Sequence, residues 1–259
     1  MSSEEMKMFK EGINLILNFW WRIRALDEDR KRPYFSKRAF ELRNGIYKRF
    51  VEYESKGGEL SPRSIQHTLR HFMNLLFNET GEFDNTSFEV SVLLCEMYQE
   101  CSKGNYDSVE VIGLANISQS RRIMGMKAHL NETNGSESGA LQGEHQVKLF
   151  REQILELLEE LWNSHVYVPP GHPCITTPDE PCITTPQQFA DDITFWFTQG
   201  KKLITQRYLE WILVNTLSLL PISAPLVGGI VKDVAEKVMA ISRKCSNSDI
   251  NPSKKPRVK

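Results

Sequence analysis

Apolar residues recur along this chain at spacings of three and four, the pattern of helices that bury one face. No stretch of adequate length alternates apolar and polar positions, as a half-exposed strand does. The sequence therefore predicts an all-α fold, a multi-helix bundle of about eight or nine helices. It also predicts a proline-broken apolar hairpin near the C-terminus.

Local signals place several of these helices. The second expected helix gathers its apolar face around Phe40, Tyr47, Phe50 and Val51. A third helix is expected to begin at Ser61-Pro62, because serine caps a helix and proline suits the first helical position. Its apolar residues form one stripe that we expect to face a core. The stripe consists of Ile65, Leu69, Phe72, Met73 and Leu76. We expect Ser87 to cap the fourth helix.

A short motif repeats with a period of eight before the expected helix over 189–199. Pro173–Pro178 and Pro181–Pro186 both read Pro-Cys-Ile-Thr-Thr-Pro. Thr185 and Gln188 form a capping box, which gives the second copy a structural role. Cys174, Cys182 and His172 offer three metal ligands, one fewer than a structural zinc site takes. We therefore favour a loop duplication over a metal site or a disulfide.

Composition divides the chain into four parts. A polar segment over 131–143 contains almost nothing apolar enough to hold it in a core, so we expect a linker there. It separates an N-terminal helical region, 1–130, from a C-terminal helical region, 144–245. Residues 246–259 are rich in Ser, Asn and bases and are expected to form a flexible tail.

Residues 211–231 form an uncharged stretch between Glu210 and Lys232. Its length matches the ~20 residues with which a helix crosses a ~30 Å hydrocarbon layer. Prolines and glycines favour a helix–break–helix, in which 203–219 and 230–244 fold against each other, over a straight span. The residues that we expect to form the membrane segment are Trp211, Leu217, Leu220, Pro221, Pro225, Leu226, Gly228 and Gly229.

Two interpretations of this segment remain open on the sequence. A hairpin at the centre of a bundle is apolar all round because other helices surround it. Membrane association, as a re-entrant hairpin or a span, accounts equally for the length and the lack of charge. Bases flank the segment on both sides, so the positive-inside rule gives no orientation.

The same part of the chain resembles a known family. Phe195–Thr205 reads Phe-Trp-Phe-Thr-Gln-Gly-Lys-Lys-Leu-Ile-Thr, and Leu219–Leu226 reads Leu-Leu-Pro-Ile-Ser-Ala-Pro-Leu. Over residues 189–240 this order is similar to the ribosome-binding region of LETM-type (leucine zipper/EF-hand-containing transmembrane) proteins. The resemblance implies an organellar membrane, with ribosome or cation-homeostasis partners.

Acids and bases nearly cancel, 33 against 32, but they are unevenly distributed. Residues 1–75 are basic and 76–120 are acidic, which suggests two faces that attract each other or different partners. Two pairs of basic residues lie eleven positions apart, a spacing that returns to nearly the same angle around a helix, so they form one basic strip. It consists of Lys37, Arg38, Lys48 and Arg49. The simplest interpretation is a solvated face whose charge complements that of the acidic region. The other interpretation is that the strip binds phosphate on lipid headgroups or RNA.

The sequence contains few candidates for a metal site or a catalytic site. His67 and His71 have the spacing of a metal clamp, but the apolar stripe of their helix puts both on the solvated side. No nucleophile motif or phosphate loop is present, and Cys95 and Cys101 fit an apolar helical pattern. We therefore expect no enzyme activity, no catalytic residue, no metal and no cofactor.

Three bases near the end of the chain, Lys254, Lys255 and Arg257, resemble a short nuclear-import signal. The leading hypothesis is a non-enzymatic, intracellular α-helical interaction protein whose C-terminal hairpin associates with a membrane. Its partners are then membrane lipid or membrane protein, or another protein, and the ribosome if the LETM resemblance holds; nucleic acid is unlikely. The alternative is a soluble helical adaptor or scaffold, nuclear or cytoplasmic, that is imported through the basic tail.

Overall fold

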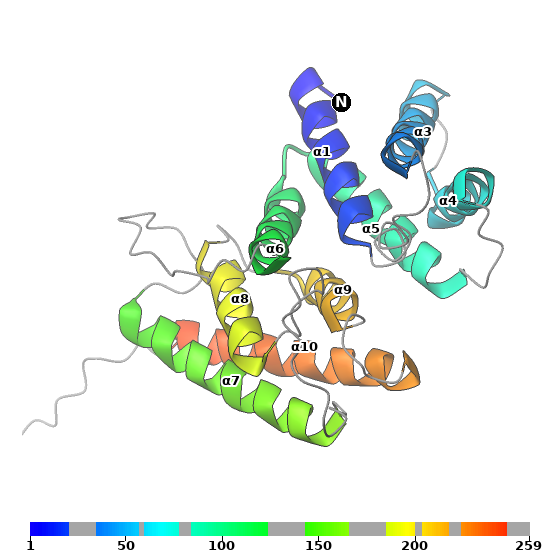
Figure 1. Ribbon diagram of the computed structural model, residues 1–259. Helices are drawn as coiled ribbons and strands as arrows, with labels where there is room; N and C mark the ends of the chain where they lie inside the picture. Colours follow the sequence, from blue (N-terminus) through cyan, green and yellow to red (C-terminus); the bar gives the residue numbers. More distant parts are fainter. Residues whose placement is uncertain are drawn as a thin grey trace, which may run out of the picture. The chain divides into compact units, whose positions relative to one another are not determined.

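The computed structural model of this chain describes residues 1–20, 35–56, 60–77, 84–123, 143–165, 185–199, 204–217 and 224–247. Within these ranges it contains nine α-helices and no strand, which confirms the all-α prediction (Figure 1). The helices are α1 (Ser3–Phe19), α3 (Phe35–Lys56), α4 (Pro62–Phe77), α5 (Asp84–Cys101), α6 (Asp107–Ile123), α7 (Glu144–His165), α8 (Pro186–Gln199), α9 (Gln206–Leu217) and α10 (Ala224–Asn247).

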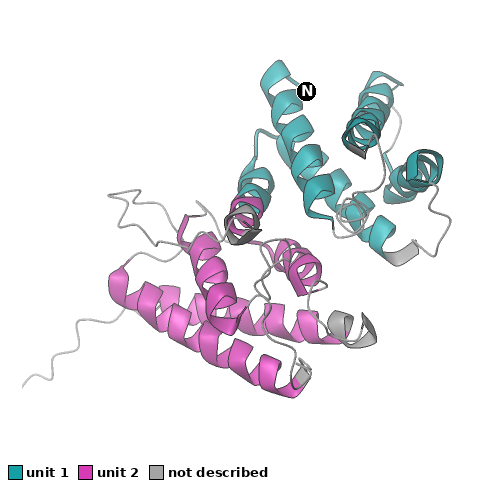
Figure 2. Ribbon diagram, viewed as in Figure 1, with its two compact units in different colours: residues 1–113 teal, residues 114–259 magenta. Residues whose placement is uncertain are grey.

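The chain divides into two compact units, Met1–Gly113 and Leu114–Lys259 (Figure 2). The first holds α1, α3, α4, α5 and the beginning of α6, and the second holds the remainder of α6 and α7 to α10. The division falls within α6. Apart from Gly143, the linker that the sequence predicts over 131–143 lies outside the described residues.

In the first unit, α1 packs on α3 and α5, and α4 packs on the same two helices. Aromatic rings join these elements, because Phe9 of α1 meets Phe50 of α3 edge-on, with ring centroids 4.7 Å apart. Tyr98 of α5 closes the cluster at 5.1 Å from each ring. The centre of this unit is therefore an aromatic core to which α1, α3 and α5 each contribute one residue.

The buried face of α3 differs from the predicted one. Ala39, Leu42, Ile46 and Phe50 are buried at spacings of three and four, whereas Phe40 and Val51 are exposed. The sequence prediction was right for Phe50 and wrong for Phe40 and Val51. Two apolar stripes compete on this helix, and the three-dimensional packing selects the one with the smaller side chains.

Helix starts test the capping predictions. The amide of Ser64 donates to Ser61 Oγ at 3.3 Å, which confirms the cap at the beginning of α4. The prediction for Ser87 was wrong, because α5 begins at Asp84 and Ser87 is buried within it. Its carbonyl accepts a hydrogen bond from the Ser91 hydroxyl at 2.6 Å.

The beginning of α8 confirms the predicted capping box. The amide of Gln188 donates to Thr185 Oγ1 at 3.2 Å, and the amide of Thr185 donates to Gln188 Oε1 at 3.0 Å. This start positions α8 against α7, where the rings of Phe150 and Phe197 lie 5.2 Å apart. Arg151 on α7 pairs with Asp191 on α8 at 2.5 Å.

The last two helices pack on each other, and α10 also packs on α7. Helix α10 continues through Gly228 and Gly229, which the sequence analysis treated as part of a break. The connection between α9 and α10 contains Pro221 and lies outside the described residues, so the proline-broken hairpin stays a prediction. Across the described part of the chain, no helix has the length and apolarity needed to span a membrane.

Candidate functional site

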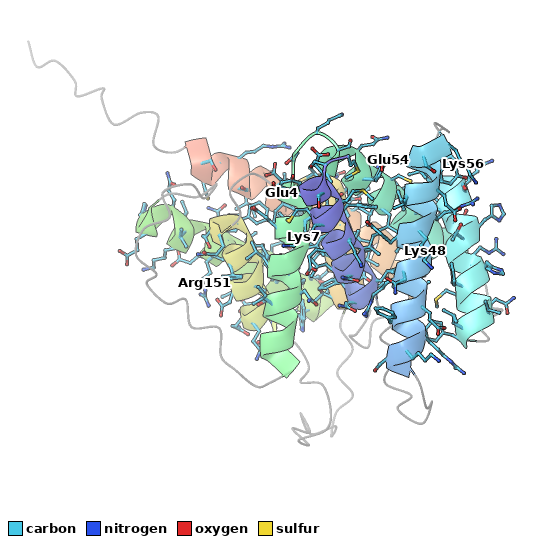
Figure 3. The ribbon with its side chains drawn as sticks, turned by 90° about the horizontal axis from the view of Figure 1, so that it is seen from above. Glu4, Lys7, Lys48, Glu54, Lys56 and Arg151 are labelled. Atoms are coloured by element: carbon cyan, nitrogen blue, oxygen red, sulfur yellow. The ribbon has the colours of Figure 1, made fainter. Side chains whose placement is uncertain are left out.

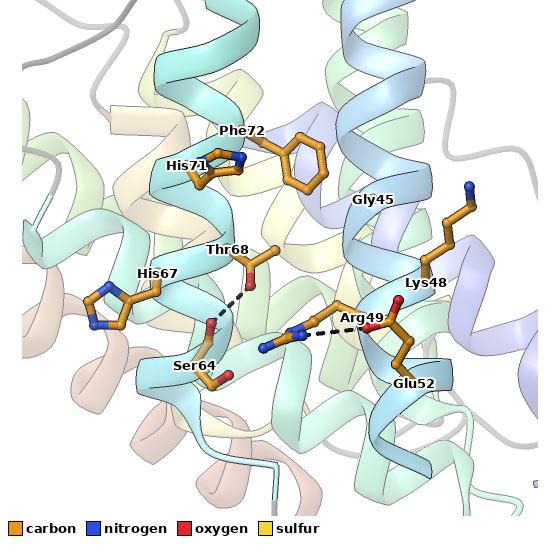
Figure 4. A pocket seen from close by; sticks show the side chains of 9 residues that line it. All are labelled: Gly45, Lys48, Arg49, Glu52, Ser64, His67, Thr68, His71 and Phe72. Atoms are coloured by element: carbon orange, nitrogen blue, oxygen red, sulfur yellow. Dashed lines mark hydrogen bonds and ion pairs between the residues drawn. The ribbon is translucent and has the colours of Figure 1, made fainter. Parts of the chain in front are cut away.

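A groove of about 640 Å³ lies between α3 and α4 of the first unit (Figure 4). This volume is within the range of sites that hold a small ligand or a few side chains of a partner. Gly45, Lys48, Arg49 and Glu52 line it from α3. From α4 the lining residues are Ser64, His67, Thr68, His71 and Phe72.

Two contacts fix how α3 and α4 lie. Near one end, the hydroxyl groups of Tyr53 and Ser64 are hydrogen-bonded to each other. Further along, the Phe72 ring packs against Gly45 so closely that a Cβ at position 45 would overlap it. The order of these pairs makes the two helices antiparallel, and the missing side chain of Gly45 leaves room for the Phe72 ring against α3.

Positive charge dominates the two helices. Helix α4 contains no Asp or Glu, and α3 and α4 together carry eight Lys and Arg against three Glu. One of the eight, Arg43, is directed elsewhere: it donates to Asn18 on α1, and burial lowers its pKa. The remaining bases leave this pair of helices with a positive field, which attracts anions.

Arg49 is the basic residue that reaches between the helices (Figure 4). Its guanidinium lies 3.4 Å from Glu52, 3.5 Å from the Tyr53 hydroxyl and 4.9 Å from the centre of the Tyr53 ring. Its Nε is buried and has no hydrogen-bond partner among the described residues, although 41% of the side chain is exposed. Because these contacts are long and the side chain is part-exposed in the groove, the guanidinium is suited to receive an oxyanion.

Lys48 and two histidines stand at the margins of the groove. In Figure 4, Lys48 and His67 point from the outer sides of their helices, and His71 lies above Thr68. All three side chains belong to exposed residues that line the groove. The Thr68 hydroxyl donates to the carbonyl of Ser64 at 3.0 Å, so it stays within α4.

The structure brings together two groups that the sequence analysis treated separately. The predicted solvated side of α4 is confirmed, since His67 and His71 are both exposed. Half of the basic strip, Lys48 and Arg49, lines the groove with them. Lys37 and Arg38 are not among the lining residues, and Lys37 lies 4.0 Å from Glu41 on the same helix. The absence of Asp and Glu from α4 was the feature of the sequence that could have indicated this basic groove.

The part of the predicted membrane segment that lies in α9 is largely buried. Trp211 and Leu217 of α9 are buried, as are Ile212 and Leu213 between them. In α10, Gly229 is exposed, and a Cβ there would meet no described side chain or other element within 4 Å. Leu220 and Pro221 lie outside the described residues, as do the side chains of Pro225 and Leu226 and the surroundings of Gly228.

Two other predicted groups stay untested by the structure. The import-signal residues Lys254, Lys255 and Arg257 and the repeated Cys174 and Cys182 lie outside the described residues. In the part of the chain that is described, no three His, Cys, Asp or Glu side chains come together as a metal site requires.

Two buried thiols have properties opposite to those of a nucleophile. Burial raises the pKa of Cys95 to about 12 and that of Cys101 to about 11, with neighbouring carboxylates adding to both shifts. A reactive cysteine has a lowered pKa and is accessible, because the thiolate is the nucleophile. These two thiols are therefore packing groups of α5.

Comparisons with protein-family models, with curated proteins and with solved structures find no match. The resemblance of residues 189–240 to LETM-type proteins therefore stays a prediction.

Proposed function

We propose that this protein is a non-enzymatic helical interaction protein that binds an anionic partner through the α3–α4 groove. The observation that carries the proposal is the arrangement around Arg49. Its side chain is 41% exposed and its guanidinium enters the groove, which Lys48, His67 and His71 also line. Charge-assisted hydrogen bonds from such a group to a carboxylate or phosphate are about twice as strong as neutral ones.

The surrounding charge supports the same function. Among the described residues that line the groove, Glu52 is the single acid, and it is already engaged by Arg49. Exposed side chains of one sign on adjacent elements raise the local concentration of counter-charged ligand and speed association. Binding an anionic partner accounts for this arrangement of charged residues without any chemical reaction.

Two other predicted roles have less support. Membrane association through residues 211–231 requires apolar side chains that face lipid, but Trp211 and Leu217 are buried in the protein. Nuclear import through the basic tail depends on residues outside the described ranges. Both stay predictions, which membrane fractionation with a carbonate wash and deletion of residues 254–259 test.

Retention of the full-length protein on immobilised heparin, a defined polyanion, tests the proposal. We expect Lys48→Glu combined with Arg49→Glu to elute at clearly lower salt than the wild type. The matched control combines Lys7→Glu on α1 with Lys148→Glu on α7, two exposed residues that do not line the groove (Figure 3 labels Lys7 and Lys48). Because both variants change the net charge equally, equal elution would contradict the proposal.

A further inference from the structure

Leu75 extends the groove with an exposed apolar surface. At 100° per residue, Ser64, Thr68, His71 and Leu75, which are spaced by four, three and four, share one side of α4. The first three line the groove, so Leu75 continues the same side beyond Phe72. It is 66% exposed, and α4 thus presents hydroxyl, imidazole and apolar side chains in that order along the groove.

From this order we propose that the groove binds an acidic amphipathic helix of another protein, with its carboxylates at Lys48 and Arg49 and an apolar side chain on Leu75. The proposal rests on the proposed function and names the class of partner. Ser64 and Leu75 are eleven residues apart, which corresponds to about 16 Å along the helix axis. A partner helix of about three turns matches this length.

Carboxylates account for the polar half of the groove. A guanidinium binds a carboxylate through charge-assisted hydrogen bonds, and the Arg49 side chain, which lines the groove, is 41% exposed. Lys48, exposed on the outer side of α3, supplies a second positive charge at the margin of the groove. Carboxylates spaced by three or four on a partner helix lie on one face, which allows several of them to be turned toward the groove.

The shape and the apolar residues distinguish a helix from other anionic partners. Arg49 lies within a hollow between two helices, where a helix lies against both walls but a flat bilayer surface does not reach. The carboxylate of Glu52 is beside it and repels a dense phosphate backbone more than it repels separate carboxylates. Phe72 and Leu75 add apolar surface that an amphipathic helix covers.

Selection from a phage library of random peptides of about twelve residues against the full-length protein tests the proposal. We expect enrichment of peptides that combine Asp or Glu at helical spacing with an apolar residue near one end. Binding of the selected peptide is then measured by fluorescence anisotropy. Lys48→Glu with Arg49→Glu, and separately Leu75→Ser, should each weaken it by about tenfold or more.

Matched variants separate a local effect from a general one. The charge control is again Lys7→Glu with Lys148→Glu, and the apolar control is Phe40→Ser. Phe40 is 60% exposed but lies about 140° around α3 from Gly45, away from the groove. Neither control should change peptide binding. If the double charge variant loses its helical circular dichroism, the single variants Lys48→Glu and Arg49→Lys replace it, and each should still weaken binding.

Two further probes, phosphatidylserine vesicles and a single-stranded RNA of about 20 nucleotides, distinguish the partner classes. The acidic-helix proposal is overturned if no acidic peptide is enriched or if Leu75→Ser binds the selected peptide as well as the wild type does. It is also overturned if no peptide binds and the protein instead binds vesicles or RNA in a way that the charge variants abolish. That second result would leave the proposed function standing, because the partner would still be anionic. If the groove charge variants bind every probe as well as the control charge variant does, both the acidic-helix proposal and the proposed function are overturned.

Discussion

At the scale of single residues, two helical glycines have opposite surroundings. A Cβ on Gly12 of α1 would overlap Met97 Sδ and lie 3.2 Å from Val109 Cγ2, and both neighbours are buried. A Cβ on Gly229 of α10 would meet no described side chain or other element within 4 Å. The same substitution by alanine therefore tests packing at one position and helix propensity alone at the other.

We expect Gly12→Ala to lower the free energy of unfolding by up to about 2 kcal/mol. Overpacking costs about 1–3 kcal/mol, and the ~1 kcal/mol that alanine gains over glycine in a helix offsets part of this cost. Gly229→Ala should instead raise the free energy of unfolding by up to about 1 kcal/mol. Urea denaturation of both variants measures the difference, and a stabilising Gly12→Ala would contradict the packing of α1 on α5.

Glu100 gives a prediction of pH dependence. Burial raises the pKa of Glu100 above its ordinary 4.5, and the neighbouring carboxylates Glu96 and Asp107 raise it further, against a smaller opposing effect of Lys103. Its Oε2 has no hydrogen-bond partner among the described residues. Because the folded pKa is raised, the stability that Glu100 contributes is present below about pH 4.5 and lost as the pH rises through the folded value.

Glu100→Gln should therefore unfold at a higher temperature than the wild type at pH 7. The advantage should shrink as the pH falls toward 4, because the wild-type carboxyl group then becomes neutral as well. Thermal melts at several pH values measure this trend. An advantage that grows on acidification would show that Glu100 is not held in a destabilising environment.

Residue patterns also show where sequence reasoning fails. Phe40 and Val51 are large and apolar, so a pattern that weighs hydrophobicity selects them over Ala39 and Ile46. In the structure, Ala39 and Ile46 are buried, and Phe40 and Val51 are exposed. Spacing alone cannot choose between two overlapping stripes, since the choice depends on the shape of the facing helices.

At the scale of elements, the ion pair between Arg151 and Asp191 fastens α7 to α8. The side chains are 33% and 24% exposed, and the 2.5 Å contact joins residues far apart in sequence. Asp233 and Lys237 form a contrasting pair at 2.8 Å within α10, where both side chains are well exposed. Screening by water makes the second pair worth much less than the first.

Double-mutant cycles with alanine should give a coupling energy of about 1 kcal/mol or more for Arg151 and Asp191. The coupling between Asp233 and Lys237 should stay below about 0.5 kcal/mol. Chemical denaturation of the single and double variants gives both values. Equal couplings would mean that the α7–α8 contact is as solvated as a surface pair.

Elements were predicted best where the signal is local. The capping box of Thr185 and Gln188 was predicted correctly because its two hydrogen bonds involve neighbouring residues only. Ser87 failed because a serine can equally be buried within a helix, and only the tertiary environment decides which. Gly228 and Gly229 interrupt the pattern of α10, yet the helix continues because neighbouring turns offset their low propensity.

At the scale of the whole molecule, the sequence predicts the all-α class but not the candidate site. Arg49 and His71 belong to different helices, and only the antiparallel packing of α3 and α4 brings them to one groove. Their approach depends on Phe72 fitting against Gly45, a contact that no periodicity reveals. What the sequence does contain is the excess of bases over these two helices.

The central claim is that the α3–α4 groove, and not the apolar segment near the C-terminus, is the binding surface. Amide hydrogen exchange of the full-length protein, with and without a saturating heparin oligosaccharide, tests it most directly. We predict slower exchange in peptides from residues 35–56 and 62–77, and no change in peptides from residues 206–217. Slower exchange confined to residues 206–217, or none in α3 and α4 at saturation, would contradict the claim.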